Sequence, residues 1–281
     1  RICRIFALIL KIFKKVIDIY ATIRYNVFIM NINSTVNAHS EQIKTIIDKK
    51  WPDSLYMPYL QANSNTYGSV EKLKEVYEPL TTLKDIVGIS IATRADCFDE
   101  EIYAYLADLN KRVPLQIELG LQTIHEHTAK LINRKTELKE FKDAISRLRE
   151  IGIEIVVHII NGLPYESKED MLETIKFINT LDIQGVKIHS LLVLKNTALA
   201  NLYEKEKFKI LSLEEYVDIT VSQIELLRPD IIIHRLGADS SLEDLIEPLW
   251  TRKKLVVMNE IDKLLRKKDS YQGILYSGQQ Q

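Results

Sequence analysis

The stretch EIVVHIINGLPYESKED, residues 154–170, is the part of the sequence that decides the fold. Its apolar, β-branched first half ends at the turn residues NGLP, 161–164, and Ser167 then precedes a helical pattern over 171–181. This order predicts a buried strand, a tight turn and a helix that Ser167 caps. Because the strand is apolar on both faces, we expect packed layers on both sides of it. The turn at its end is either a ligand site, as such turns often are in α/β folds, or an ordinary connection.

The same order of strand, polar turn and helix recurs along the chain. Apolar runs that predict strands occur at 55–60, 86–92, 115–119, 153–160, 186–194 and 231–234. Helical patterns occur at 40–50, 70–80, 100–110, 125–132, 137–151, 213–227 and 242–268. Such alternation indicates parallel strands joined by right-handed crossovers. Since no glycine-rich nucleotide-binding sequence follows any of these strands, a doubly wound nucleotide-binding sheet is not indicated. We therefore predict an α/β fold, a partial parallel (β/α) TIM-like barrel.

Composition narrows the class of protein further. The chain has 281 residues, of which 46% are hydrophobic and 27% charged, as in a globular domain with a sizeable core. The net charge of −1 provides no overall attraction to nucleic acid or to anionic membranes. The two cysteines, Cys3 and Cys97, form no disulfide framework, so we expect a reducing, cytoplasmic location. They are also too few for a metal site made of cysteines alone.

The first 37 residues differ in composition from the rest and are rich in isoleucine, phenylalanine and basic residues. Apolar residues near helical spacing predict an amphipathic helix, which either contacts a membrane surface or is a packed or foreign leader. The longest uncharged apolar run, Ile5 to Leu10, cannot span a bilayer. We expect residues 1–37 to lie outside the native core, residues 38–268 to form the barrel with its C-terminal helices, and residues 269–281 to be frayed.

If the strands form a barrel, the polar side chains at their carboxyl ends gather at one end of it. Arg94 is a fixed cation suited to a carboxylate, and the amides in this set suit hydroxyl groups or an amino acid. Glu118 lies inside an apolar strand, where a carboxylate is costly unless it is paired. It therefore either serves a ligand site or forms a buried ion pair with Arg94. The set is Gln61, Asn63, Asn65, Thr93, Arg94, Asp96, Glu118, Gln122, His158, Asn161, His189, His234 and Arg235.

Three histidines, His158, His189 and His234, occur in successive predicted strands. They could bind a divalent metal ion in a barrel hydrolase that uses Glu118 as its base. However, no H-x-H or H-E-x-x-H sequence completes such a site, so three separately hydrogen-bonded histidines are the preferred interpretation.

The joint pattern of three stretches resembles a known family. ELGLQT at 118–123, LINR at 131–134 and EIVVHIINGLP at 154–164 look like the corresponding parts of radical S-adenosylmethionine (radical SAM) proteins. The resemblance is greatest to the bacterial YhcC/YtqA-type group and covers about residues 39–268. It implies a partial (β/α) barrel that binds S-adenosylmethionine at a 4Fe-4S cluster. In the family, the reduced cluster cleaves this cofactor to a 5′-deoxyadenosyl radical, which abstracts a hydrogen atom from the substrate.

The resemblance also implies which residues bind the cofactor. Polar side chains at the strand ends would contact its amino acid and ribose parts, and adenine would lie against the apolar turn at 160–163. The only partner that the resemblance implies is this small-molecule cofactor. It does not identify the substrate. The implied cofactor-binding residues are Gln61, Asn63, Thr93, Arg94, Glu118, Gln122, Asn161, Gly162, Leu163 and His189.

The chain departs from the family at its amino end. The family has its first strand and a loop with three cysteine ligands before the segment that begins here near His39, but residues 1–37 contain only Cys3. We therefore expect a truncated or disrupted family member that lacks the first strand and does not bind the cluster. A non-catalytic ligand- or partner-binding barrel is the second possibility, and the metal-dependent hydrolase is the third.

Overall fold

The structure, a computed structural model, describes residues 25–30, 55–61, 63–238 and 243–278. The chain divides into two compact units. The first unit is Arg1–Gly120 with Glu140–Val156, and the second unit is Leu121–Lys139 with Val157–Gln281. Strands β4 and β5 each run from one unit into the other.

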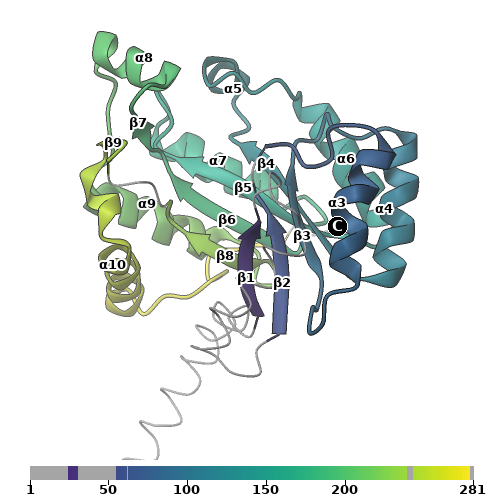
Figure 1. The fold of residues 1–281 in the computed structure, drawn as a ribbon. Helices are drawn as coiled ribbons and strands as arrows, with labels where there is room; N and C mark the ends of the chain where they lie inside the picture. Colours follow the sequence, from purple (N-terminus) through teal and green to yellow (C-terminus); the bar gives the residue numbers. More distant parts are fainter. Residues whose placement is uncertain (1–24, 31–54, 62, 239–242, 279–281) are drawn as a thin grey trace, which may run out of the picture. The chain divides into compact units, whose positions relative to one another are not determined.

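Strands and helices alternate along the chain, as the sequence predicts (Figure 1). One sheet has the strand order β1-β2-β3-β4-β5-β6-β8, and its pairs β1–β2, β2–β3, β3–β4 and β6–β8 are parallel. All six predicted strands are present, although 186–194 divides into two short strands. The strands of this sheet are β1 (Tyr25–Met30), β2 (Leu55–Leu60), β3 (Ile89–Thr93), β4 (Leu115–Gln122), β5 (Glu154–Asn161), β6 (Gly185–Ser190) and β8 (Ile232–Leu236).

Strand β1 corrects the prediction that residues 1–37 supply no strand. It pairs in parallel with β2, from Tyr25 opposite Leu55 to Met30 opposite Leu60. Its sequence, YNVFIM, is rich in the β-branched and aromatic residues that favour strands, and it satisfies the backbone groups along one edge of β2. The expectation of a lost first strand rested on composition and on the absence of the family's three-cysteine loop, and it was wrong at these six residues. The helices predicted within residues 1–24 and 40–50 lie outside the described residues.

The first unit packs helices α3 (Val70–Thr81), α4 (Glu100–Arg112) and most of α6 (Leu138–Glu150) with its strands. Helix α4 begins where the Asp99 carboxylate accepts a hydrogen bond from the Ile102 N–H at 2.8 Å, an N-cap that satisfies one of the helix's unpaired donors. The core of this unit is made of buried aliphatic and aromatic side chains, so burial of apolar surface is its main stabilising force. Its members include Leu80, Ile89, Ile91, Leu106, Leu109, Ile117 and Leu148.

The second unit contains most of the C-terminal helices. Helices α7 and α9 both begin with a capping box, Ser167 with Asp170 and Ser212 with Glu215, which confirms the predicted cap at Ser167. The short strands β7 (Val193–Leu194) and β9 (Leu245–Glu247) pair antiparallel in a separate two-stranded sheet. The helices are α5 (Glu126–Leu131), α7 (Lys168–Ile178), α8 (Ala198–Glu206), α9 (Leu213–Leu226), the 3₁₀ helix η2 (Leu249–Arg252) and α10 (Lys254–Lys267).

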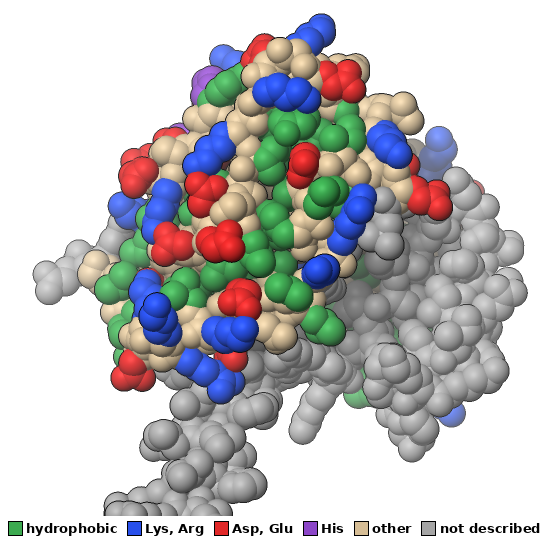
Figure 2. All heavy atoms as spheres, turned by 90° about the vertical axis from the view of Figure 1, so that its left-hand side faces the viewer, with side chains coloured by type: hydrophobic (Ala, Val, Ile, Leu, Met, Phe, Trp, Pro, Cys, Tyr) green, Lys and Arg blue, Asp and Glu red, His purple; other side chains and the backbone are tan. Residues whose placement is uncertain are grey.

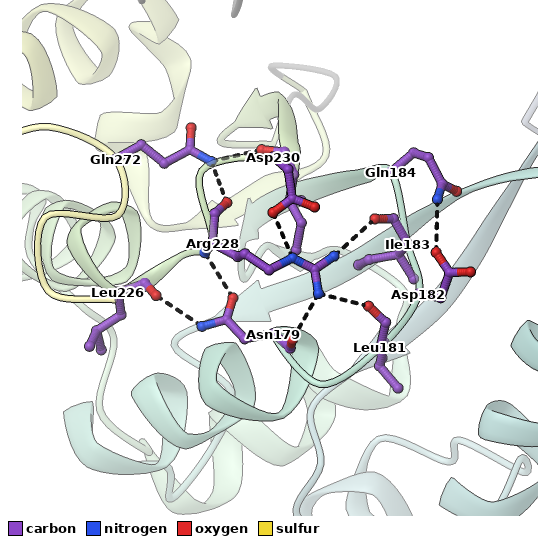
Figure 3. A network of polar contacts seen from close by, with 10 residues as sticks. Asn179, Leu181, Asp182, Ile183, Gln184, Leu226, Arg228, Asp230 and Gln272 are labelled. Carbon is purple, nitrogen blue, oxygen red and sulfur yellow. Dashed lines mark hydrogen bonds and ion pairs between the residues drawn. The ribbon is translucent and has the colours of Figure 1, made fainter. Parts of the chain in front are cut away.

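A polar network around Arg228 connects three segments of the second unit (Figure 3). The guanidinium group donates to the carbonyls of Asn179 and Leu181 at 2.9 and 3.2 Å and pairs with Asp230 at 2.7 Å. From the C-terminal segment, the Gln272 amide donates to the Arg228 carbonyl at 2.9 Å. Backbone hydrogen bonds also join Gly273 and Leu275 to helix α9, so the prediction of a frayed tail is wrong for these residues.

The face of the second unit that carries α9 and α10 shows acidic and basic side chains interspersed, with hydrophobic surface between them (Figure 2). Leu249 and Leu255 are exposed hydrophobic residues of η2 and α10. The two signs of charge are therefore mixed on this face and form no large field of one sign. Across the part of the chain that the structure describes, no helix has the length and apolar character needed to cross a membrane.

Candidate functional site

The loop after β2 is fixed by a buried asparagine. The Asn65 amide nitrogen donates to the Leu60 and Ala92 carbonyls at 2.8 and 2.7 Å, which fixes the orientation of the side chain. Its carbonyl oxygen, Oδ1, is then buried without a hydrogen-bond partner. Next to it, the hydroxyls of Thr66 and Thr93 are 2.6 Å apart. An unpaired buried acceptor is costly in a folded protein, so Oδ1 is suited to a donor group of a ligand.

Glu118 is buried in the middle of β4, where it is only 3% exposed. The Ser90 hydroxyl donates to its carboxylate oxygen Oε1 at 2.8 Å. In the register of β3 and β4, Ala92 lies opposite Glu118. The carboxylate therefore provides a second buried acceptor in the first unit.

The proposed alternative of a buried Glu118–Arg94 ion pair is wrong. Arg94 instead forms an ion pair with Asp96, two residues along the chain, and its Nε–Oδ1 distance is 2.9 Å. Its side chain is 52% exposed. The hydrogen bonds that Arg94 donates to the Asp96 carboxylate raise the pKa of Arg94 above its usual value. Arg94 is thus a surface cation at the end of β3 with a local partner.

Gln61 and Asn63, the two amides predicted at the end of β2, are exposed. Asn63 has a φ of 64°, a left-handed conformation that asparagine tolerates better than most residues. The Asn63 carbonyl accepts a weak hydrogen bond of 3.4 Å from the Asn65 amide. These two amides therefore line the surface of the loop whose buried part is Asn65.

Asn161, at the end of β5, has a structural partner. Its side-chain amide and that of Gln223 in α9 exchange two hydrogen bonds, of 2.7 and 2.8 Å, and the Gln223 amide also donates to the Met171 carbonyl at 3.1 Å. Asn161 is 1% exposed and Gln223 is fully buried. The amide of Asn161 is thus directed toward the helices that cover the strand, and its hydrogen bonds to Gln223 serve packing rather than ligand binding.

The turn after Asn161, at Gly162 and Leu163, packs against other side chains of the protein. Gly162 has a φ of +85°, and its N–H donates to the Met171 sulfur at 3.2 Å. A Cβ atom at this position would lie 3.1 Å from the Cδ1 atom of Leu211, so the close approach that glycine allows here is to a side chain. Leu163 is buried in an apolar cluster with Leu191, Val193, Ala200 and Phe208. These contacts give no support to the predicted role of this turn in binding adenine.

Two partly buried charged residues of the second unit, Arg134 after α5 and Glu166 after β5, were not identified from the residue pattern as site residues. The Arg134 guanidinium donates to the carbonyls of Leu121, at 2.8 Å, and of Thr123. Its side chain is only 8% exposed. In the same unit, burial raises the pKa of the Glu166 carboxyl, although Thr123 and Thr128 hydroxyls oppose the rise. These contacts fix the segment after Gln122, whose own φ is 60°.

The three strand histidines do not form one metal site. The rings of His158 and His189 lie side by side, with centroids 5.0 Å apart. His234, however, is the extra residue at a shift in the pairing of β6 and β8. Ile233 pairs with Val186 and Arg235 pairs with Lys187, so His234 lies level with these two residues of β6. At about 3.3 Å per residue, it is displaced from His189 by roughly 8 Å along the sheet. The hydrolase hypothesis that needs all three is therefore not supported.

A different group, His125, Asp170 and Glu173, has ligand atoms within 4.8 Å of one another. His125 Nε2, however, lies 3.0 Å from the Asp170 carbonyl oxygen, so this nitrogen is placed to donate a hydrogen bond rather than to bind a metal. The group also lies at the N-terminus of α7, where the helix dipole disfavours a cation.

Comparison with known proteins agrees with this arrangement of strands. The sequence matches the Radical SAM superfamily over residues 54–178 and the Radical SAM C-terminal domain over residues 183–267. YtqA of Bacillus subtilis is 45% identical over 231 residues, which cover 82% of this chain and 72% of YtqA. The chain belongs to the radical SAM superfamily. YhcC of Escherichia coli strain K12 is 29% identical to this radical SAM protein over 211 residues, covering 75% of the chain and 68% of YhcC.

The fold of this radical SAM protein is similar to that of a solved relative. Elp3 of the archaeon Methanocaldococcus infernus, with its first residues deleted, matches with a TM-score of 0.73 at 18% identity. The match covers 88% of this chain and 64% of the Elp3 chain. At this identity the likeness concerns the fold alone. Together with the parallel strand order, it confirms the predicted partial (β/α) barrel.

The cysteines of this radical SAM protein do not suit a 4Fe-4S cluster. Such a cluster in this superfamily needs three thiolates close together, and the sequence has two cysteines far apart. Cys97 is a free, buried cysteine after β3, and burial raises the pKa of its thiol, which disfavours the thiolate that binds metal. The residues present therefore do not fit the cluster.

Proposed function

We propose that this radical SAM protein binds S-adenosylmethionine with the carboxyl-end polar groups of its first unit. The relationship to YtqA, which spans 82% of the chain, supports the choice of ligand. The observation that carries the proposal is the buried acceptor Asn65 Oδ1, whose orientation is fixed and which has no partner. S-adenosylmethionine offers an ammonium group and ribose hydroxyls, which are hydrogen-bond donors.

Each predicted residue of the first unit takes a part in this proposal. Glu118 is the second buried acceptor, held by Ser90, and a carboxylate strengthens the binding of a cation. Thr93 provides a hydroxyl that is hydrogen-bonded to that of Thr66, the residue after Asn65, and Arg94, Gln61 and Asn63 are exposed at the strand ends. For Gln122 and His189, which belong to the second unit, binding of the cofactor stays a prediction from the resemblance.

We derive no cleavage of S-adenosylmethionine by this chain. In the superfamily that reaction requires a reduced cluster, and the two cysteines do not provide its ligands. The part of the function that its own residues can perform is to bind and orient the cofactor. Radical chemistry on a substrate would need thiolate ligands that are not in this sequence.

Calorimetric titration tests the proposal with two ligands, S-adenosylmethionine and 5′-methylthioadenosine, which lacks the amino acid part. We expect the protein to bind S-adenosylmethionine more tightly, because only this ligand carries the ammonium group. Glu118→Gln keeps the shape and an acceptor for Ser90 but removes the charge, so it should weaken S-adenosylmethionine binding about tenfold. Its effect on 5′-methylthioadenosine should be smaller.

Glu75→Gln is the matched control, since Glu75 is an exposed carboxylate of α3 in the same unit. It should leave both affinities unchanged. The proposal fails if the protein binds neither ligand, or if Glu118→Gln affects both ligands to the same extent as the control does.

A further inference from the structure

A cavity of about 510 Å³ opens along the stretch that runs from α5 to the first residues of α6. Its lining residues all lie between Glu126 and Lys139, and this whole stretch belongs to the second unit. Binding sites for small molecules have volumes of about 300–1,000 Å³, so the cavity has room for such a ligand. None of the predicted cofactor residues lines it.

Arg134 fixes the wall of this cavity. Its guanidinium donates to the Thr136 carbonyl at 3.0 Å, in addition to the carbonyls of Leu121 and Thr123. Its backbone N–H donates to the Ala129 carbonyl at 2.8 Å. Because these bonds hold the turn between the two helices, the cavity is already shaped in the free protein, and a ligand has little to order on binding.

The charges that line the cavity are mainly positive. Arg134 and Glu126 offset each other in an ion pair of 3.2 Å, which leaves Glu137 as the remaining acidic side chain of the described lining. The other charged residues of the lining are three lysines, Lys130, Lys135 and Lys139. Their side chains are exposed, and none of the three forms an ion pair with another described residue. Three ammonium groups therefore face one carboxylate here.

This set of side chains matches a ligand with several anionic oxygens. A lysine ammonium is a compact charge with three donors, and a phosphate group accepts charge-assisted hydrogen bonds from it. Three ammonium groups around one cavity can bind a chain of two or three phosphate groups better than a single one. A long polyanion is matched less well, because all three lysines lie within residues 130–139 and the whole chain has a net charge of −1.

We propose that this lysine-lined cavity binds a small compound with a diphosphate or triphosphate group. It is a second ligand site, which goes beyond the binding of S-adenosylmethionine and shares no residue with the site proposed for that cofactor. The three lysines bind the phosphate oxygens, and Arg134 holds the turn that carries two of these lysines, Lys135 and Lys139.

Calorimetric titration of the full chain with inorganic triphosphate tests the site in metal-free buffer at constant ionic strength, with sulfate as the reference anion. We expect saturable binding of one triphosphate per chain, tighter than that of sulfate. Lys130→Gln, Lys135→Gln and Lys139→Gln should each weaken it about five- to tenfold, as for the loss of one exposed charge-assisted hydrogen bond. Lys135→Arg keeps the charge and should bind nearly as well as the unaltered protein.

Lys176→Gln is the matched control, because Lys176 is an exposed lysine of α7 in the same unit and does not line the cavity. It should leave the triphosphate affinity unchanged. Lysine acetylation followed by mass spectrometry is a second readout on the unaltered protein, in which triphosphate should protect the three cavity lysines and not Lys176. The proposal is overturned if triphosphate binds no more tightly than sulfate, or if the cavity variants behave like Lys176→Gln.

Titration with a single-stranded RNA oligonucleotide distinguishes a small ligand from a polyanion. We expect the three glutamine variants to change the affinity for triphosphate and not the affinity for RNA. If RNA binds and these variants weaken its binding, while inorganic triphosphate does not bind, the cavity serves a nucleic-acid backbone and the proposal is overturned.

Discussion

The side-chain amides of Asn161 and Gln223 bind each other through two hydrogen bonds, of 2.7 and 2.8 Å, although the residues are 62 positions apart. The pair joins the end of β5 to the middle of α9 in a place that excludes water. An unpaired amide there would lose its hydrogen bonds to water without replacement. Asn161, one of the residues that the resemblance implied for cofactor binding, is therefore part of the packing between strand and helix.

Asn161→Ala should lower the free energy of unfolding by about 2–3 kcal/mol, because it leaves the Gln223 amide buried without its partner. The double variant Asn161→Leu with Gln223→Leu should lose less than the sum of the two single variants, since it removes both polar groups together. Urea unfolding of the unaltered protein, of Asn161→Ala, of the single variants Asn161→Leu and Gln223→Leu, and of the double variant measures these differences. Single variants as stable as the unaltered protein, or strictly additive losses, would contradict this account.

Arg228→Lys should lower the free energy of unfolding by about 2 kcal/mol. A lysine keeps the positive charge, but its single ammonium group cannot reach the carbonyls of Asn179 and Leu181 together in the planar arrangement that arginine provides (Figure 3). Thermal or urea unfolding measures the loss. Asp230→Asn is the control, because Asp230 is 65% exposed and its ion pair with Arg228 should contribute less than about 1 kcal/mol. Equal effects of the two variants would argue against the network.

Arg94→Ala should change the free energy of unfolding by less than about 1 kcal/mol, because exposed ion pairs contribute little. Arg94 is 52% exposed and pairs with a neighbour two residues away, Asp96. Had it been the buried partner of Glu118, its removal would have left an uncompensated charge and cost about 3–5 kcal/mol. Urea unfolding distinguishes the two cases, and a loss in the larger range would restore the buried pair.

The fold was largely predictable because strands and helices leave local patterns. The apolar runs at 55–60 and 153–160 became β2 and β5, and Ser167 caps α7 as its position predicts. The run YNVFIM at 25–30 has the same kind of pattern, but the unusual composition around it led us to exclude it from the barrel. A run of β-branched and aromatic residues such as this one favours a strand whatever the composition of the residues around it.

The site was less predictable, because the partner of a polar side chain is set by tertiary contacts. Nothing near Asn161 in the sequence indicates Gln223, and nothing near Glu118 indicates Ser90 as its donor. Asn65, which has an unpaired acceptor, was one amide among several in a polar loop. Only the carbonyls of Leu60 and Ala92, brought together by pairing of β2 and β3, distinguish it from Asn63.

Glu166 should make the protein less stable as the pH rises. Burial raises the pKa of its carboxyl above the ordinary value of 4.5, so the folded state binds this proton more tightly than the unfolded state does. The stabilising contribution of the bound proton is fully present below about pH 4.5 and is lost as the pH rises through the folded-state pKa.

Glu166→Gln removes this ionisation and keeps an oxygen that can accept from Thr123 or Thr128. We expect the variant to gain stability over the unaltered protein as the pH is raised from 4 to 7, with the smallest difference at the acid end. Urea unfolding at several pH values measures this trend. Asp170 is the control of opposite sign, because hydrogen bonds from Ser167 lower its pKa. The stability that Asp170 contributes is fully present above its ordinary pKa of 3.8 and is lost as the pH falls through its lowered folded-state pKa, so Asp170→Asn should differ from the unaltered protein in its pH dependence mainly below about pH 4. A Glu166→Gln curve parallel to that of the unaltered protein from pH 4 to 7 would show that Glu166 ionises alike in both states.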